Sequence, residues 1–184
     1  DMVHVALLRG INVGGKNKVG MKELKDVFEK AGLDSVTTYI NSGNVIFRSP
    51  IRSRSRLADL IEPAVEERFG FDIAVTVRDL GNMRKVVKAI PGKWTNDGTM
   101  KCDVMFLWDD VDRPSVVKKL PIKPDLEDVR YVPGALIWRV DRKNITRSGM
   151  MRMAGTPLYK RMTIRNVNTT RKLAELMEAT RASS

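Results

Sequence analysis

Three segments of the sequence combine glycine, asparagine and basic residues in patterns that could bind a ligand. The first, residues 10–17, reads Gly-Ile-Asn-Val-Gly-Gly-Lys-Asn and nearly matches the phosphate-binding loop G-x-x-x-x-G-K-[ST]. Asn17 stands where that loop has a hydroxyl for magnesium, and residues 18–20 separate it from the next predicted helix, whose N-terminus would face the phosphates. Three interpretations remain: an NTPase loop, a loop that wraps another ligand, and a loop whose glycines only permit positive φ.

The second segment, residues 39–45, reads Tyr-Ile-Asn-Ser-Gly-Asn-Val between two apolar stretches. Asparagine and glycine at a tight turn favour a β-hairpin, and a bare hairpin would need only one Asn-Gly pair. The functional alternative is that the polar side chains at the tip of this turn line a pocket.

The third segment, residues 163–173, is the predicted end of a strand that runs into the start of a helix. Asn166 or Asn168 can cap this helix by accepting backbone N–H bonds. The helix dipole, Arg165 and the neighbouring basic side chains would together favour an anion. Ordinary capping and anion binding are therefore the two interpretations of this corner.

Positive charge is concentrated near the C-terminal end of the sequence. The formal net charge is +11, and residues 130–172 hold eleven Lys and Arg but one acid, Asp141. Such a patch could attract a phosphate, a nucleotide or nucleic acid, or it could be a solubilising surface. Aromatic residues are only 6% of the chain, which weakens a role in stacking on bases.

The sequence contains few candidates for catalytic or metal-binding residues. The only histidine, His4, and the only cysteine, Cys102, lie in predicted strands and are expected to be buried. They cannot make a zinc site of the usual kind, and the acids at Asp109 and Asp110 are interpreted as helix caps rather than cation ligands. We therefore predict no metal site, no cofactor and no catalytic residue. An enzyme of unknown reaction remains an alternative, with Ser42 and Lys16 as its only candidates.

The location follows from the same composition. A single cysteine gives no disulfide framework, so cytoplasmic residence is expected. No apolar run approaches the roughly 18 residues of a membrane helix, so no membrane partner is expected. The oligomeric state is left open.

Strand and helix patterns recur in the same order in both halves of the chain. The first half alternates as strands 3–8, 36–40, 45–48 and 73–77 with helices 21–31 and 57–69, followed by helix 80–90. The second half alternates as strands 102–108, 129–132, 136–140 and 162–164 with helices 114–120 and 144–153, followed by helix 168–182. We predict an α+β fold of two ferredoxin-like (βαββαβ) subdomains with antiparallel sheets and a linking helix, residues 1–94 and 95–184. No repeat of individual residues is visible.

Together, the three segments resemble a known family. Arg-Gly-Ile-Asn-Val-Gly-Gly at 9–15, Tyr-Ile-Asn-Ser-Gly-Asn-Val at 39–45 and the pattern T-x-R-N-x-x-T-x-x-K-L at 163–173 are similar to the domain of unknown function 1697. Val167 departs from that pattern, because the family often has tryptophan after Arg-Asn. The resemblance implies a two-subdomain ferredoxin-like fold in a bacterial cytosolic protein, with no established activity.

We predict an uncharacterised protein that binds a phosphorylated small molecule or nucleotide in the cleft between the subdomains. A nucleic-acid-binding accessory protein that uses residues 130–172 is the alternative. The predicted ligand-binding residues are Arg9, Asn12, Gly14, Gly15, Lys16, Asn41, Ser42, Asn44, Arg165, Asn166, Thr169 and Lys172. We expect residues 9–16 and 41–44 to lie on opposite edges of one sheet, so that the first loop would instead meet the 165–169 corner.

Overall fold

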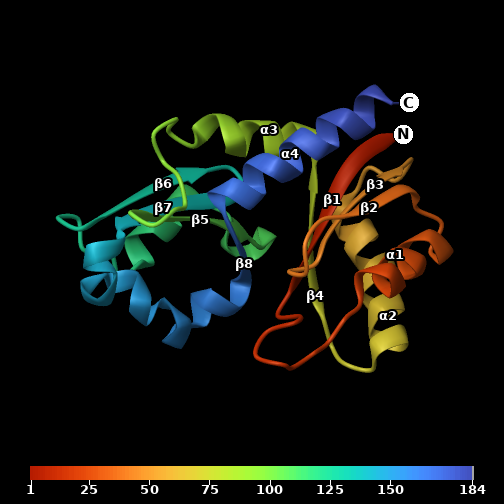
Figure 1. Cartoon of the computed structure of the whole chain (residues 1–184), viewed down its shortest axis with the longest axis horizontal. Helices are drawn as coiled ribbons and strands as arrows, with labels where there is room; N and C mark the ends of the chain where they lie inside the picture. The colour runs from red at the N-terminus through yellow and green to blue at the C-terminus, as the bar shows by residue number, and fades with distance from the viewer. Residues whose placement is uncertain (184) are drawn as a thin grey trace. The chain divides into compact units, whose positions relative to one another are not determined.

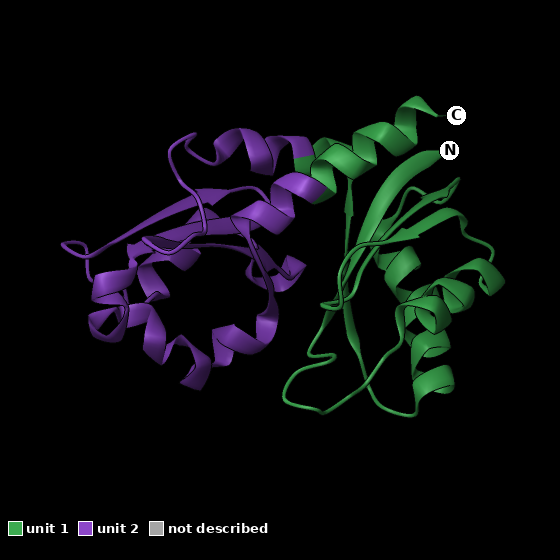
Figure 2. Ribbon diagram, viewed as in Figure 1, with its two compact units in different colours: residues 1–83, 173–184 green, residues 84–172 purple. Residues whose placement is uncertain are grey.

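Eight strands form two four-stranded antiparallel sheets in the computed structural model, which describes residues 1–183. This confirms the predicted α+β class with antiparallel sheets. The chain divides into unit 1, residues 1–83 and 173–184, and unit 2, residues 84–172 (Figure 2). The predicted domain limits at residues 94 and 95 stay a prediction. Within residues 1–183, no helix combines the length and apolar character needed to span a bilayer.

Unit 1 is built around a sheet with the strand order β2-β3-β1-β4 (Figure 1). Its elements in chain order are β1 (Met2–Arg9), α1 (Met21–Lys30), β2 (Asp34–Thr38), β3 (Asn44–Ser49), α2 (Arg54–Phe69) and β4 (Ala74–Asp79). Leu24 and Phe28 of α1 and Ile61 of α2 pack on one face of this sheet against Leu8 and Phe47. The apolar spacing of both helices thus buries one stripe of each against the strands.

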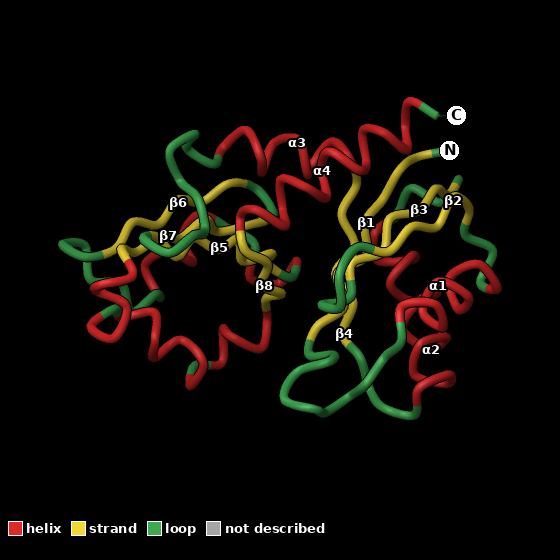
Figure 3. Tube along the Cα trace, viewed as in Figure 1, coloured by secondary structure: helices red, strands yellow, loops and turns green. Residues whose placement is uncertain are grey.

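Unit 2 has a sheet of the corresponding order, β6-β7-β5-β8. Its strands are β5 (Met100–Leu107), β6 (Glu127–Val132), β7 (Ala135–Asp141) and β8 (Met162–Asn166). One face of this sheet packs against the short 3-10 helices η2 (Pro114–Lys119), η3 (Arg142–Arg147), η4 (Gly149–Gly155) and η5 (Pro157–Arg161), and η1 (Asp109–Val111) follows β5 directly. The tube in Figure 3 shows these helices as short red segments.

The helices predicted at residues 114–120 and 144–153 are short 3-10 helices, namely η2 in the first case and η3 with η4 in the second. Ser148 breaks the second of them with an extended backbone. Its hydroxyl and the N–H of Gly149 both donate to the buried carboxylate of Glu127, which pulls the chain out of a helical path. Gly149 cannot carry a side chain, because a Cβ there would lie 1.4 Å from the Pro121 carbonyl oxygen.

Each unit's last strand leads into a long helix. α3 (Leu80–Ala89) follows β4, and α4 (Val167–Ala182) follows β8. The boundary between the units falls inside both helices. Within unit 1, Arg48 donates to the Thr180 carbonyl oxygen of α4 at 3.2 Å.

The strand registers reveal a repeat of individual residues that the sequence analysis missed. Thr76-Val77-Arg78-Asp79 of β4 corresponds to Thr163-Ile164-Arg165-Asn166 of β8, because Val5 of β1 pairs with Arg78 and Val104 of β5 pairs with Arg165. The order Gly-x-x-Ile-aromatic-Arg also recurs, at residues 43–48 and 134–139. Both glycines have positive φ, and each accepts a 2.9 Å hydrogen bond from the first sheet strand.

Candidate functional site

The loop at residues 10–17 is a small hairpin of its own. The N–H of Lys16 donates to the Val13 carbonyl oxygen at 3.0 Å, and the N–H of Asn12 donates to the Asn17 carbonyl oxygen at 3.1 Å. Gly14 and Gly15 between them have φ values of +56° and +75°, which is the backbone of a type I′ turn. The glycines are thus needed for positive φ, and two backbone donors of the segment are used inside it.

This geometry differs from that of a phosphate-binding loop. Such a loop presents its backbone N–H groups and a helix N-terminus to the phosphates. Here α1 begins only at Met21, and the Glu23 carboxylate lies over Gly20, where an added Cβ would meet its Oε2 at 2.0 Å. The chain's own carboxylate therefore occupies the place beside the helix N-terminus. The NTPase interpretation has no support in this arrangement.

Asn12 joins this loop to the turn at residues 39–43. Its Nδ2 donates to the Asn41 carbonyl oxygen at 2.8 Å and to the Val19 carbonyl oxygen at 3.0 Å, while its Oδ1 accepts from the Val19 N–H at 2.8 Å. Asn12 itself has φ +53°, which asparagine tolerates better than most residues. One side chain thus fixes both ends of the loop and attaches it to the neighbouring turn.

The turn at residues 39–43 lies at the end of β1, next to the loop. The Leu8 N–H donates to the Gly43 carbonyl oxygen at 2.9 Å, and Leu7 is the register partner of Asn44. The expectation that the first two segments lie on opposite edges was therefore wrong. Because β1 and β3 are antiparallel, the point where β1 ends is the point where β3 begins.

Polar side chains in this turn hold the turn itself. Asn44 is fully buried, and its Nδ2 donates to the Tyr39 carbonyl oxygen at 2.8 Å and to Ser42 Oγ at 2.9 Å. The structural interpretation thus accounts for Asn44 and Ser42. Gly43 has φ +86°, and a Cβ there would lie 2.7 Å from Ile11 Cδ1, so loop and turn are packed against each other.

We call residues 9–20 and 39–44 the stitched edge. It carries Arg9, Lys16 and Lys18 and no acid between residues 9 and 20, and both lysines are exposed. It also presents two aliphatic side chains: Val13 is 65% exposed and Ile40 is 48% exposed. Neither residue was predicted to belong to a site, although each directly adjoins an asparagine that was.

The third predicted segment contains an ordinary helix cap. Asn166 Oδ1 accepts from the Thr169 N–H at 2.9 Å, and Thr170 donates to the Asn166 carbonyl oxygen at 2.9 Å. Arg165 is 8% exposed and donates to the Ile164 carbonyl oxygen, and burial lowers the pKa of Arg165 to about 10. The capping interpretation therefore explains Asn166 and Thr169, whose predicted role as ligand contacts stays a prediction together with that of Lys172.

The same corner occurs in unit 1, which separates structural roles from functional ones. Asp79 Oδ1 accepts from the Asn82 N–H at 2.8 Å, as Asn166 does from Thr169. Arg78 is 3% exposed and donates to the Val77 carbonyl oxygen at 3.1 Å, as Arg165 does to the carbonyl before it. A buried arginine followed by an Asx cap is thus how both units connect the last strand to its helix.

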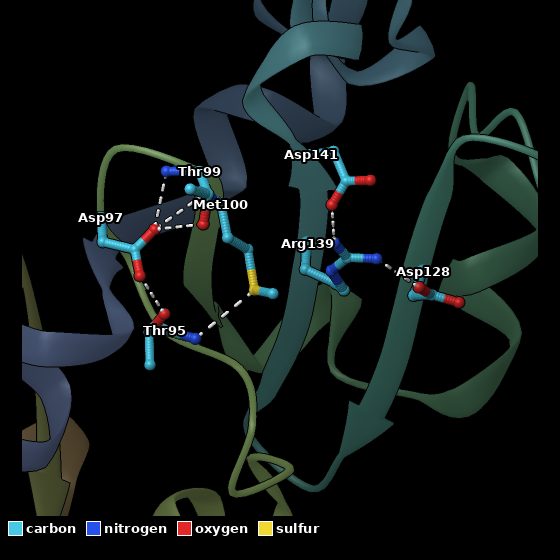
Figure 4. Close-up of polar contacts among 7 residues, drawn as sticks. All are labelled: Thr95, Asp97, Thr99, Met100, Asp128, Arg139 and Asp141. Carbon is cyan, nitrogen blue, oxygen red and sulfur yellow. Dashed lines mark hydrogen bonds and ion pairs between the residues drawn. The ribbon is translucent and has the colours of Figure 1, made fainter.

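The basic stretch at residues 130–172 is less available than its composition indicates. Figure 4 shows Arg139 between Asp128 and Asp141, with the Asp128 pair at 3.2 Å. Arg161 pairs with Asp110, and Arg130 lies over the Trp94 ring at 5.2 Å. Further arginines bind backbone or amide oxygens: Arg142, Arg147 and Arg171. Acids outside the window and internal carbonyl groups thus engage much of its charge.

The acidic residues of unit 2 have internal partners as well. Asp112 accepts from Tyr131 Oη at 2.7 Å and from the Gly134 N–H at 3.0 Å, so it ties the hairpin between β6 and β7. Hydrogen bonds from the Thr95 hydroxyl and from Thr99 hold the pKa of Asp97 well below its usual range (Figure 4). Across residues 1–183, His, Cys, Asp and Glu side chains nowhere gather in threes around a possible metal position.

The two residues with the greatest potential reactivity are buried in strands. Burial, with a contribution from Asp103, raises the pKa of the Cys102 thiol to about 12, so it is not a thiolate nucleophile. His4 is fully buried against Phe47, with ring centroids 5.6 Å apart. Burial lowers the pKa of His4, although Asp79 and a backbone interaction with Met2 oppose this.

Comparison with known proteins gives a family but no activity. Residues 2–138 match the family described as Protein of unknown function (DUF1697). The chain belongs to this family. The match includes both segments of the stitched edge and ends before the third predicted segment at residues 163–173.

A solved structure matches over nearly the whole chain. The conserved bacterial protein SP0830 from Streptococcus pneumoniae superimposes with a TM-score of 0.81 and 29% sequence identity. The superposition covers 96% of this chain and 98% of that protein. A comparison with curated proteins finds no match.

Proposed function

We propose that this DUF1697 protein is a non-catalytic binding protein and that the stitched edge is its surface for an anionic ligand. The observation that carries the proposal is that unit 1 adds to a shared fold a loop and a turn joined by Asn12, with three cations and no acid between residues 9 and 20. Unit 2 forms the corresponding sheet and corner without such an addition. An ordered loop that the shared fold does not require indicates a role in binding, because binding residues are often carried by loops on a rigid scaffold.

The proposed ligand is the same as in the sequence-based prediction, but the proposed site is the stitched edge of unit 1 instead of the cleft between the subdomains. The ligand stays anionic, and phosphate-bearing small molecules and nucleotides stay within its range. Arg9, Lys16 and Lys18 supply charge, and Asn12 and Asn41 hold the two segments in register. The ferredoxin-like classification of both units belongs to the proposal too, supported by the shared strand order.

Backbone NMR of the ¹⁵N-labelled protein, titrated with pyrophosphate and then with ATP, tests the proposal. We expect amide shifts to concentrate at residues 10–20 and 39–43, and to disappear in Lys16→Glu/Lys18→Glu because both positions are exposed cations of the edge. The matched control is Lys118→Glu/Lys119→Glu, which makes the same charge change on an exposed pair in unit 2.

The contrary outcomes are specific. Shifts that concentrate around Lys143, Arg152 and Lys160 would move the site to the basic stretch and favour the nucleic-acid alternative. A response of the edge that is equal in both double variants would refute the proposal, and so would an edge that responds to no anionic ligand, whether a phosphate compound or an acidic peptide.

A further inference from the structure

We infer that the anionic ligand of the stitched edge is a segment of another protein that presents carboxylates beside aliphatic side chains. This inference rests on the proposed function and adds the class of partner. It starts from Val13 and Ile40, two of the four large apolar side chains that are most exposed in residues 1–183. The other two, Leu60 and Met151, lie elsewhere, on α2 and η4.

Val13 belongs to the loop and Ile40 to the turn, and one hydrogen bond joins these two segments. Each directly adjoins one residue of the bond between Asn12 and Asn41, whose atoms are 2.8 Å apart. The backbone segments that carry the two apolar side chains are therefore joined one residue away from each of them. A fixed pair loses less conformational entropy when a partner covers it.

Ile40 has an unfavourable backbone for its type. Its φ is +50°, a region that a β-branched residue rarely occupies, whereas its neighbour Asn41 belongs to a type that tolerates it. A β-branched residue at such a position costs stability, and 48% of Ile40 remains exposed, so burial within this chain offsets only part of that cost. Strain of this kind persists where a function needs the side chain.

The shape of the edge favours a protein over a small metabolite. A small-molecule site encloses most of its ligand, whereas Val13 at 65% exposure and Ile40 at 48% project into solvent. Projecting aliphatic side chains beside cations fit a partner surface that has apolar side chains among carboxylates. The edge's one aromatic residue, Tyr39, is half-buried, so it offers little for stacking on a base.

Two synthetic peptides of equal length and charge test this inference on the intact protein. One repeats Glu-Glu-Leu and the other repeats Glu-Glu-Ser, so they differ only in apolar content. We expect the leucine peptide to bind about tenfold tighter, because it also covers Val13 and Ile40. Isothermal titration gives both Kd values, and amide shifts confirm the location.

The preference should depend on the two aliphatic residues. In Val13→Ser/Ile40→Asn we expect the two peptides to bind equally, while the control Leu60→Ser/Met151→Ser keeps the tenfold preference. Circular dichroism verifies that both variants are folded.

Equal binding of the two peptides to the unaltered protein would overturn the inference, and so would a preference that survives in Val13→Ser/Ile40→Asn. If pyrophosphate shifts the edge amides while the peptides show no preference, the ligand is a small phosphate compound and the proposed function stands. If pyrophosphate and both peptides leave the edge unchanged, the proposed function fails as well.

Discussion

Units 1 and 2 share a sheet order and a strand-to-helix corner, but their loops differ. In unit 1, residues 10–20 separate β1 from α1 and residues 39–43 connect β2 to β3. In unit 2, residues 108–113, which include η1, separate β5 from η2, and residues 133–134 suffice between β6 and β7. The shorter connections of unit 2 show what this topology requires, so the longer ones of unit 1 are additions.

The charge of these connections differs in the same way. After β1, residues 9–20 contain Arg9, Lys16 and Lys18 without an acid, whereas Asp109, Asp110 and Asp112 follow β5. In unit 2 the acids are used internally, by Arg161, Tyr131 and Gly134. The acidic connection therefore serves the fold of unit 2, while Lys16 and Lys18 of the basic connection are exposed to solvent.

The largest expected effect separates a closely packed glycine of the stitched edge from one that faces open space. Gly43→Ala combines positive φ with contacts of 2.7 Å to Ile11 and 2.9 Å to Leu8, and we expect a loss of about 3 kcal/mol in the free energy of unfolding. Gly15→Ala has positive φ but open space, and we expect about 1 kcal/mol. Urea unfolding followed by far-UV circular dichroism measures both. Equal losses would mean that the packing of the turn against Ile11 and Leu8 adds no stability.

A second prediction compares the side chains that tie each unit's hairpin. Asn12→Ala removes three hydrogen bonds, and Asp112→Ala removes two, so we expect losses of about 2 kcal/mol in each case. All three tryptophans lie in unit 2, at Trp94, Trp108 and Trp138. Tryptophan fluorescence should therefore report the Asp112 variant directly. If Asn12→Ala leaves the free energy of unfolding unchanged, the three hydrogen bonds of the Asn12 side chain do not stabilise the stitched edge.

The sequence predicted the positions of strands and helices along the chain well, but it predicted less well which of their ends lie together in the fold. Alternating and helical apolar patterns located the strands and α-helices to within a few residues, because burial of one face dictates those patterns. The 3-10 helices of unit 2 escaped, since the pull of Glu127 on Ser148 is a long-range contact. The stitched edge was missed although the predicted antiparallel topology implies it, because β3 begins beside the end of β1 when these two strands are neighbours.

The candidate site was predictable by residue type but not by role. Asn166 could be interpreted as a cap or as a ligand contact, and only its 2.9 Å bond from the Thr169 N–H distinguishes the two. Val13 and Ile40 looked like ordinary apolar residues, because exposure cannot be predicted from an isolated aliphatic residue in a loop.

The third prediction concerns the pH dependence of stability, which should involve a different pH range in each unit. Burial lowers the pKa of His4 in unit 1, so the unfolded chain binds a proton more readily. Stability should therefore fall by about 1.4 kcal/mol per pH unit below about pH 6.5, until His4 protonates in the folded state. His4→Phe should remove this slope in urea titrations from pH 7 to 5. An unchanged slope would place its origin elsewhere.

Glu127 provides the matching case in unit 2. Burial alone would raise its pKa, but bonds from Ser148, Lys123, Gly149 and Trp138 prevail and lower it. Its contribution is therefore complete above its ordinary pKa of about 4.5 and is lost as pH falls below that value. Tryptophan fluorescence of Glu127→Gln should lack this acid-side loss. His4→Phe, in contrast, should retain it.

The smallest expected effect has the opposite sign. Ile40→Asn relieves the positive φ of a β-branched residue, so we expect a gain of about 1 kcal/mol in the free energy of unfolding. Thermal unfolding of this variant beside Ile46→Val, a truncation in the buried core, gives the comparison. A loss of stability in Ile40→Asn would mean that Ile40 serves the fold and would weaken the partner inference.

The repeated corner at residues 76–79 and 163–166 also bears on the protein's ancestry. Matching residues at matching registers are what duplication of a half-length gene leaves behind, and an ancestor of that length would have carried one such corner. After duplication, one copy can keep the inherited scaffold while the other diversifies. In this chain the longer loops after the first strand and before the third belong to the N-terminal copy, so under the proposed function relatives should differ there first.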